Sequence, residues 1–328
     1  MLVARVLTDA RMNFPLELSA QDATISGDWS VEWHPPAAAG ETPVYAAEAC
    51  VTLERWKQAA ASPEAIPSDI EQVVLVSRGA LAPEPSLFLS NLSGNADTPL
   101  VFGKGSLSPD GRQLVYSDEY DRLFILDIST GKKTAIGEGH APRWSPNGKQ
   151  IAFLRLTDQG FNVFVMEVDG SGLRALTDTN TNPLIFMWTP DSRNLVIALD
   201  SVGYTYQLLN LNDASQTLLL RTEQAYANDM AISSDGLWMA YLDKVPGKMT
   251  PGVYLARIDG SDKRLLMQLD HWVAFTPVFS PDGRWLAINV MDTDLPDTPI
   301  IPTLIEVSSC KIVPLSGLKG SEIQEWSK

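Results

Sequence analysis

Five copies of one short sequence constrain the fold of this chain more than any other feature. Each copy is an apolar run that ends in Ser or Thr, then Pro-Asp-Gly or a close variant, then a second apolar run. The copies are "LSPDGRQLVY" (107–116), "WSPNGKQIAF" (144–153), "WTPDSRNLVI" (188–197), "ISSDGLWMAY" (232–241) and "FSPDGRWLAI" (279–288). The proline column falls at Pro109, Pro146, Pro190, Ser234 and Pro281, at intervals of 37, 44, 44 and 47 residues. Because Pro presets φ, Asp accepts a backbone hydrogen bond and Gly adopts the left-handed conformation, each copy predicts a β-hairpin.

Two further strands follow each predicted hairpin. The third strands read "LFILDI", "NVFVMEV", "YQLLNL", "GVYLARI" and "TLIEV". Short turns such as "STGK" and "DGSG" then lead to fourth strands such as "TAIG" and "RLLM". Four antiparallel strands in about 40 to 47 residues, repeated, are the sequence signature of a propeller blade. The sequence therefore predicts an all-β propeller.

The C-terminal run "GSEIQEWSK" predicts how the propeller closes. A further 47 residues from Pro281 reach Lys328, so residues 322–327 lie in register with the first strand of a blade. Upstream, residues 73–78, 86–94 and 99–103 read as second, third and fourth strands that lack a first. Pairing of 322–327 with 73–78 completes a sixth blade from both ends of the chain and removes two exposed sheet edges. The alternative is a longer protein with a further blade beyond Lys328.

Residues 1–70 do not follow the repeat. We expect a small N-terminal appendage of mixed structure there, packed on the propeller or on a partner, and the six-bladed β-propeller over residues 71–328. Within the appendage, residues 44–62 have helical composition and residues 14–33 favour one or two strands, with a linker-like loop at 35–43.

The Ser-Pro-Asp-Gly column, the Trp or Phe before it and the stretch "NVFVMEVDGSGLRALTD" (162–178) resemble the WD-like repeats of TolB-type β-propellers. Similar repeats occur in tricorn-type proteases and in the propeller domains of prolyl-oligopeptidase relatives. The resemblance covers about 73–328 and implies the fold, whereas many unrelated functions share this scaffold. TolB itself has a larger α/β domain before its propeller, which residues 1–70 do not match, so a role in the Tol-Pal system is not carried over. The sequence also contains no G-x-S-x-G pentapeptide of the hydrolase relatives.

Charge and cysteine content limit the partners and the compartment. The net charge of −15, from 25 basic and 40 acidic residues, argues against general nucleic-acid binding and favours a basic partner. No apolar run is long enough for a membrane helix, so no membrane insertion is predicted. Repeats of this type are frequent outside the cytoplasm, and we expect a periplasmic or secreted protein whose leader is absent from the chain, with the cytoplasm as the alternative. Spacing does not decide whether Cys50 and Cys310 pair, and two unlinked thiols are the simpler interpretation.

The residues four positions before the Trp or Phe column are expected where the first strands enter the central channel. They are Gly103, His140, Leu184, Asn228, Phe275 and Glu322, with Asp229, His271 and Trp272 nearby. This mixture of imidazole, carboxylate, amide and apolar groups predicts a site for a small ligand or a peptide end. Convergence of His140, His271 and Glu322 would instead suit zinc or manganese, although no two histidines have ligand spacing on one element. A purely structural role in hydrogen bonding at the channel mouth is the third interpretation.

An acid stands at or just beyond the end of each second strand. The loops that follow vary in length, and strand direction places them on the face opposite the Pro-Asp-Gly turns. The acids are Asp118, Asp158, Asp200, Asp243 and Asp292, joined by Asp294 and Asp297. Around a ring they would form an acidic rim that attracts a Lys/Arg-rich partner or a hard cation such as calcium, or they simply keep the strand ends in solvent.

Together these features predict a non-catalytic scaffold that binds a protein or peptide through its variable, acid-rimmed face, as a monomer or as a component of a hetero-complex. No catalytic residue, cofactor or metal is assigned. Two alternatives stay open: a propeller hydrolase or lyase with a metal or acid–base site at the channel mouth, and an accessory propeller of a separately encoded protease.

Overall fold

The computed structural model describes residues 49–70, 73–79, 86–158, 160–178, 183–201, 203–222, 230–248, 250–270, 272–292 and 299–327. Within these ranges the chain consists almost entirely of strands, with one α-helix and one short 3-10 helix at Ser316–Leu318. The described residues belong to one compact unit. None of the helices in these ranges is long and apolar enough to span a bilayer.

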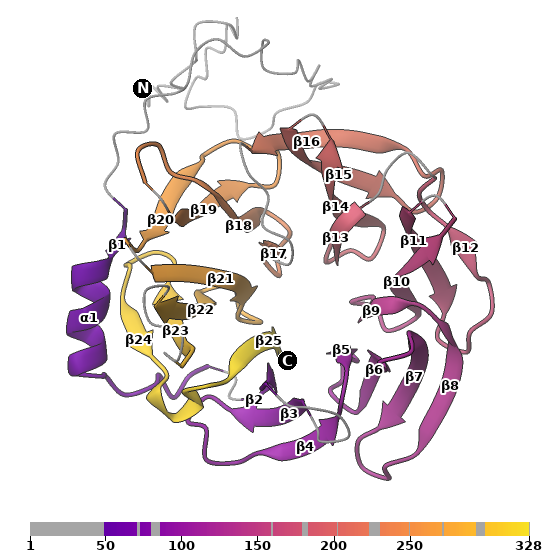
Figure 1. Ribbon diagram of the computed structural model, residues 1–328, viewed down its shortest axis with the longest axis horizontal. Coiled ribbons are helices and arrows are strands. Elements are labelled where there is room, and N and C mark those ends of the chain that lie inside the picture. Colours follow the sequence, from indigo (N-terminus) through magenta and orange to yellow (C-terminus); the bar gives the residue numbers. More distant parts are fainter. Residues whose placement is uncertain are drawn as a thin grey trace, which may run out of the picture. The chain divides into compact units, whose positions relative to one another are not determined.

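The strands form six sheets around a central axis (Figure 1), and we name these blades A to F. Blade A, from the inner to the outer strand, is β25 (Glu322–Trp326), β2 (Val73–Ser77), β3 (Leu87–Asn91) and β4 (Thr98–Val101). Blade B is β5 (Lys104–Leu107), β6 (Gln113–Ser117), β7 (Arg122–Asp127) and β8 (Lys133–Glu138), and blade C is β9 (His140–Trp144), β10 (Gln150–Thr157), β11 (Gly160–Glu167) and β12 (Arg174–Ala175). Blade D is β13 (Pro183–Trp188), β14 (Asn194–Ser201), β15 (Gly203–Asn210) and β16 (Gln216–Thr222). Blade E is β17 (Met230–Ile232), β18 (Trp238–Lys244), β19 (Pro251–Arg257) and β20 (Arg264–Gln268), and blade F is β21 (Trp272–Phe279), β22 (Trp285–Asp292), β23 (Ile301–Glu306) and β24 (Ile312–Pro314).

The repeated turn is built by a hydroxyl and a carboxylate from the same copy of the sequence. In blade B, Ser108 Oγ donates to Asp110 Oδ1 at 2.6 Å and accepts from the Gln113 amide at 2.9 Å. The same Asp110 oxygen accepts from the Arg112 amide at 3.1 Å, and Gly111 adopts φ 68°. The corresponding pairs are Ser145–Asn147, Thr189–Asp191, Ser233–Asp235 and Ser280–Asp282. These bonds satisfy the polar groups of the turn locally, which is why the motif encodes a hairpin wherever it occurs.

The core consists of six apolar clusters, one between each pair of neighbouring blades. Side chains that alternate along a second strand go to different clusters: Leu114 packs toward blade A, and Val115 packs toward blade C. The second strands are therefore apolar at nearly every position. Trp144, Trp188 and Trp326, expected in the wedge between blades, are 6%, 7% and 6% exposed and lie in these clusters.

The ring closes through the C-terminal strand, as the sequence predicted. β25 pairs antiparallel with β2, with Val74 opposite Trp326 and Ser77 opposite Glu322. The apolar residues of β25 then join the core between blades F and A. In Figure 1 the yellow β25 lies beside the indigo β2 at the central axis. The six-bladed β-propeller is thereby confirmed.

The residues before the propeller form a shorter helix than the sequence predicted. Val51 and Thr52 form β1, which pairs in parallel with β20 as a fifth strand of blade E, and α1 spans only Leu53–Ala61. The expected helix over 44–62 is wrong at Val51–Thr52 because these two residues pair with a sheet edge. Thr52 then becomes the N-cap, and its Oγ1 accepts from the Arg55 amide at 3.4 Å. The expected strands in 14–33 and the loop at 35–43 lie outside the described residues, and the boundary at residue 70 stays a prediction.

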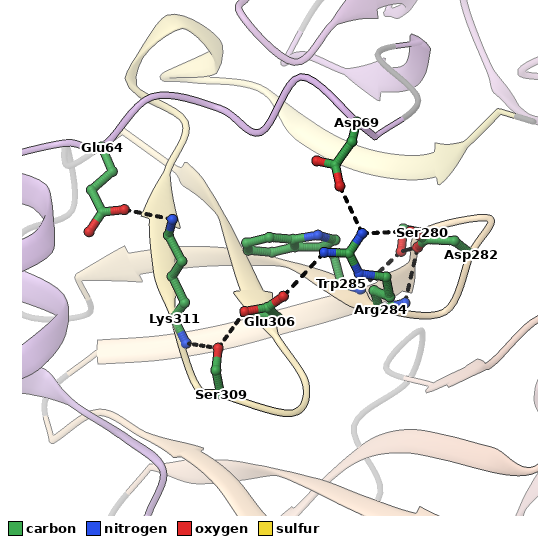
Figure 2. Close-up of polar contacts among 9 residues, drawn as sticks. All are labelled: Glu64, Asp69, Ser280, Asp282, Arg284, Trp285, Glu306, Ser309 and Lys311. Atoms are coloured by element: carbon green, nitrogen blue, oxygen red, sulfur yellow. Dashed lines mark hydrogen bonds and ion pairs between the residues drawn. The ribbon is translucent and has the colours of Figure 1, made fainter.

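The segment after α1 is held on blade F by ion pairs, which Figure 2 shows. Arg284 Nη1 lies 2.9 Å from Asp69 Oδ2, and Arg284 Nη2 lies 3.4 Å from Glu306 Oε1. Lys311 Nζ lies 2.8 Å from Glu64 Oε2. These pairs are largely exposed and contribute little to stability. The buried contacts are those of Ile70, 6% exposed in the core between blades F and A, and of Trp56 in α1, 2% exposed, whose Nε1 donates to Thr303 Oγ1 at 3.0 Å.

Cys50 and Cys310 form a disulfide with Cα atoms 5.9 Å apart, so the expectation of two unlinked thiols is wrong. Cys50 precedes β1 on blade E, and Cys310 lies in the turn between β23 and β24 on blade F. The Arg55 guanidinium donates to both cysteine carbonyl oxygens, at 3.3 Å in the case of Cys310. The two residues are 260 positions apart, and only the folded ring brings them together.

Candidate functional site

A cavity of about 310 Å³ lies where the inner strands of blades A, B, C and F begin. Its lining comprises Ser77, Leu87, Gly103, Lys104, Gly105, Ala141, Pro142, Arg143, Thr276, Glu322 and Gln324. Most of these residues lie on inner strands, with Lys104 and Glu322 at the first positions of β5 and β25 and Arg143 and Thr276 further along β9 and β21. Ser77 ends a second strand and Leu87 begins a third strand. These strand ends share a face with the variable loops between second and third strands. The cavity therefore opens at the channel mouth on the variable-loop face.

Backbone irregularities shape two walls of this cavity. The pairing of β9 with β10 shifts register between Ala152 and Leu154, and Ala141 opposite has φ 48°. The pairing of β21 with β22 shifts between Phe275 and Val278, and Thr276 has φ 49°. Bulges re-aim side chains, and positive φ in a non-glycine residue costs roughly 1–3 kcal/mol. Two such residues at equivalent positions, both lining one cavity, mark it as the candidate site.

A network of hydrogen bonds fixes the carboxylate of Glu322 on one side of the cavity. Glu322 Oε1 accepts from Thr276 Oγ1 at 3.1 Å, and Oε2 accepts from Ser77 Oγ at 3.2 Å. Gln324 Nε2 donates to the same Ser77 hydroxyl at 3.0 Å. Side chains from strands β2, β21 and β25 thus present polar groups in a fixed arrangement, which suits recognition of a polar ligand.

Two further charged side chains come from the inner strands of blades A and C. Arg143, on β9, lines the cavity, and burial lowers its pKa while Glu325 opposes this shift. Burial raises the pKa of Glu325, on β25, although the Leu107 amide, Arg143 and Ser106 each act to lower it. The Leu107 amide donates to Glu325 Oε2 at 3.0 Å. The channel interior is therefore polar and charged.

The structure places the predicted channel residues in three groups. Glu322 lines the cavity, as does Gly103. His140 and Phe275 lie next to the lining residues Ala141 and Thr276, because the bulges shift the cavity wall by one position. Asn228, Asp229 and His271 lie outside the described residues, and for Trp272 only the backbone, at the start of β21, is described.

His140 interacts with a loop of the preceding blade. Its Nδ1 lies 3.0 Å from Asp121 Oδ1, and both side chains are partly exposed. Across the described part of the chain, no group of three or more His, Cys, Asp or Glu side chains is arranged to hold a metal ion. Because His271 is outside that part, the alternative of a site made by His140, His271 and Glu322 stays a hypothesis.

Sequence reasoning missed the residues just inside the mouth. Ser77, Arg143, Thr276 and Gln324 line the cavity, yet none was singled out. The prediction counted four residues back from the Trp or Phe column and so assumed regular strands, whereas bulges change which residues face the channel. An Arg placed between the apolar residues Pro142 and Trp144 of an inner strand, as in "HAPRW", is the signal in the sequence that points to Arg143.

The predicted acidic rim is only partly present among the described side chains. Asp158 is exposed, whereas Asp118 is held by Arg122 Nη2 at 2.6 Å. Burial raises the pKa of Asp118, but the hydrogen bonds from Arg122 and nearby amides outweigh this and leave the pKa below its usual value. Asp243 is 3% exposed and paired with Lys263, so it does not face solvent as expected. The side chains of Asp200, Asp292, Asp294 and Asp297 lie outside the described residues.

A second cavity, of about 330 Å³, lies between blades D and E beside the Pro-Asp-Gly turns. Asp191, Asp235 and Asp259 surround its apolar wall, and each carboxylate accepts hydrogen bonds within its own turn. These acids have a structural role in the hairpins, so this cavity is not the candidate site.

Comparison with known proteins agrees with this architecture. A family model described as the TolB beta propeller domain matches residues 96–266, which is 171 of the 328 residues. "Uncharacterized peptidase YuxL" of Bacillus subtilis (strain 168) is 26% identical over 204 residues, which cover 57% of this chain and 29% of that protein. The chain spans less than a third of the length of the curated relatives it matches.

Solved structures show the same fold at low identity. TolB from Acinetobacter baumannii superposes with a TM-score of 0.61 and 19% identity, covering 79% of this chain and 69% of TolB. An oligogalacturonate lyase in complex with manganese superposes with a TM-score of 0.52 and 16% identity, covering 73% of this chain and 75% of the lyase. At these identities the likeness shows the fold alone. The family match over more than half of the sequence goes further, and the chain belongs to the TolB β-propeller domain family.

Proposed function

We propose that this protein is a non-catalytic binding module that holds a segment of a protein or peptide partner at the channel mouth on its variable-loop face. The observation that carries the proposal is the cavity of about 310 Å³, where fixed polar and charged side chains from four blades converge. Its volume is at the lower end for ligand pockets, which suits a few residues of an extended chain.

The chemistry of the lining supports a peptide. Ser77, Thr276 and Gln324 offer hydroxyl and amide groups, and such groups match the donors and acceptors of a polypeptide backbone. The rigid inner strands position them, so little conformational entropy is lost when a ligand binds. The variable loops on the same face would contact the rest of the partner. The acidic rim contributes less than expected, because Asp118 and Asp243 are paired with Arg122 and Lys263.

The expected extracytoplasmic location remains part of the proposal. The Cys50–Cys310 disulfide supports it, because disulfides persist in oxidising compartments and are rare in the cytosol. Purification of the native protein from fractionated cells, with thiols blocked before lysis, would test both points.

A selection of displayed random peptides on the immobilised protein tests the binding proposal. The probe variant is Gln324→Trp, which fills the cavity from β25, and the matched control is Lys149→Trp, an exposed position in the turn on the opposite face. We expect the selected peptides to lose at least about tenfold in affinity with Gln324→Trp and to keep it with Lys149→Trp. Peptides that bind both variants equally well, or a selection that yields no saturable binder, would reject the proposal.

An acid–base enzyme is the second candidate, and the His140–Asp121 contact at 3.0 Å favours it. A carboxylate beside Nδ1 orients an imidazole for proton transfer. His140→Gln would then abolish turnover of a substrate while leaving peptide binding intact. The third candidate, an accessory propeller of a separately encoded protease, draws on the similarity to a protein named as a peptidase. Stimulation of a purified, separately expressed hydrolase by this protein would be its signature.

A further inference from the structure

Arg143 stands out among the residues that line the mouth cavity. It lies on β9, partly buried, between the buried residues Pro142 and Trp144. Its carbonyl oxygen accepts from Trp188 Nε1 at 3.1 Å, which fixes the backbone. Its guanidinium makes no hydrogen bond or ion pair with any residue in the described ranges, although it carries five donors.

Glu325 is the acid that interacts electrostatically with Arg143, but it does not neutralise it at close range. The Glu325 carboxylate is directed to blade B, where it accepts from the Leu107 amide at 3.0 Å and interacts with Ser106. Burial lowers the pKa of Arg143, yet arginine stays protonated in proteins. A positive charge is therefore held in a partly desolvated cavity without a hydrogen-bonded partner, and a bound anion would relieve this cost.

The charges around the cavity are distributed unequally. Lys104, exposed on β5, and Arg143 stand on the walls from blades B and C, whereas Glu322 is tied to Ser77 and Thr276 on the walls from blades A and F. Among the side chains that line the cavity, two are cationic and one is acidic, while Glu325 lies outside the lining and is directed to blade B, in a protein whose net charge is −15. A locally positive site on a strongly acidic protein selects for a ligand with a negative group at that point.

We propose that Arg143 and Lys104 bind a carboxylate of the peptide partner, either its C-terminal carboxylate or an Asp or Glu side chain. The inference rests on the proposed function and names the group that this site recognises. The planar guanidinium matches a carboxylate with two parallel hydrogen bonds, and Lys104 adds a second positive charge at the cavity entrance. Because a C-terminal carboxylate and an acidic side chain present the same group to Arg143, the experiment must distinguish these two sources.

Three pools of random hexapeptides, each carrying an uncharged BODIPY label at the N-terminus, test this proposal by fluorescence polarisation. The first pool has a free C-terminal carboxylate and no acidic side chain, the second is amidated with one central Glu, and the third is amidated without any acid. The variants are Arg143→Gln, Arg143→Lys and Lys104→Gln. The matched control is Arg112→Gln, which removes the same charge from an exposed turn on the opposite face of blade B.

We expect the first or second pool to bind more tightly than the third, which identifies the source of the carboxylate. Arg143→Gln should weaken that pool by about 10- to 100-fold, as for loss of a charged hydrogen bond, and leave the third pool unchanged. The affinity of Arg143→Lys should lie between those of the wild type and Arg143→Gln, because lysine keeps the positive charge but lacks the two parallel N–H donors of the guanidinium. Lys104→Gln, at an exposed position of β5, should give a smaller loss that shrinks at high salt.

Two results would overturn the inference, and they are distinguishable. Equal binding of all three pools, or equal effects of Arg143→Gln and Arg112→Gln, would leave the peptide-binding function in place and remove the carboxylate site. Absence of saturable binding by every pool to the wild-type protein would remove the proposed function and this inference together.

Discussion

The Asp243 carboxylate, on β18, is a buried charge with a defined partner. Its side chain is 5% exposed and lies 2.9 Å from Lys263 Nζ, whose side chain is 20% exposed. Lys263 Nζ also lies 4.4 Å from the centre of the Tyr254 ring. A buried ion pair of this kind contributes little compared with an apolar pair, but removal of one partner leaves the other charge buried and unpaired.

We therefore expect Asp243→Ala to lower the free energy of unfolding by about 3–5 kcal/mol. Urea denaturation followed by tryptophan fluorescence measures this change. The control is Lys248→Ala, which breaks the pair with Asp270; these side chains are 41% and 52% exposed, so the loss should stay below about 1 kcal/mol. Equal losses in the two variants would contradict the assigned role of Asp243.

The turn carboxylates predict how stability depends on pH. The hydrogen bond from Ser233 Oγ lowers the pKa of Asp235 below the ordinary aspartate value, although burial opposes this shift, and the corresponding bond from Ser108 Oγ lowers the pKa of Asp110. A depressed folded-state pKa contributes stability above the unfolded pKa, and this contribution is lost as the pH falls through the folded value.

Asp235→Asn is a suitable probe, because Asn147 occupies the same position in blade C and accepts the same bond from Ser145 Oγ at 2.8 Å. We expect the wild type to exceed this variant by at most about 1 kcal/mol at pH 7, since the carboxylate is largely solvated. The difference should begin to shrink as the pH falls to about 3.8, the ordinary pKa of an aspartate, and should vanish only below the depressed folded-state pKa of Asp235. Urea titrations between pH 7 and pH 3 measure this difference in the free energy of unfolding. A difference that grows as the pH falls would contradict a lowered pKa for Asp235 in the folded state.

At the scale of single elements, the Pro-Asp-Gly hairpin is the unit that repeats. Four of its five copies carry Pro, and the copy of blade E carries Ser234, which is exposed. Ser233 and Asp235 on either side make the same hydrogen bonds as their counterparts in the other blades. The backbone at Ser234 is therefore compatible with proline.

Ser234→Pro should raise the free energy of unfolding by about 0.4–1 kcal/mol, because proline restricts the unfolded chain at a position whose folded conformation it already fits. Chemical denaturation measures the gain, and Ser234→Ala should change stability by less. A destabilised Ser234→Pro variant would mean that the turn of blade E differs from the other four.

The inner strands show why the elements were predictable and their channel-facing residues were not. The apolar pattern and the turn chemistry locate the strands of each blade, including the closing strand β25. The bulges in β9 and β21, where Ala141 and Thr276 have positive φ, change which residues face the channel, and no local sequence pattern records them. The prediction therefore named His140 and Phe275, whereas the next residues along the chain, Ala141 and Thr276, line the cavity.

At the scale of the whole molecule, the Cys50–Cys310 disulfide links the outer strand of blade E to the outer turn of blade F. The Cα atoms are 5.9 Å apart, within the usual range of about 4.4–6.8 Å. The bond spans 260 residues of sequence and restricts the unfolded chain, so it stabilises the fold mainly by lowering the entropy of the unfolded state.

The double variant Cys50→Ser with Cys310→Ser should lose about 2–4 kcal/mol of stability. Thermal unfolding measures the loss, and unreduced wild type should migrate faster than reduced wild type on a denaturing gel. Either single variant should lack this mobility shift. Identical unfolding of wild type with and without a reductant would show that the bond contributes nothing to the fold.

The sequence by itself determined the number of blades, the order of their strands and the closure of the ring. The blades and the order of their strands follow from local rules, namely hydroxyl–carboxylate turns and apolar strands. Closure follows from two incomplete pieces of one repeat, a first strand at the C-terminus and the strands of 73–103 that lack one. The tertiary structure alone decided which residues meet at the channel mouth, that Asp243 is buried on Lys263 and that Cys50 reaches Cys310. The cavity contacts and the disulfide join residues from different blades, whereas Asp243 on β18 and Lys263 just before β20 meet within blade E. All of these contacts depend on packing that only the folded ring creates.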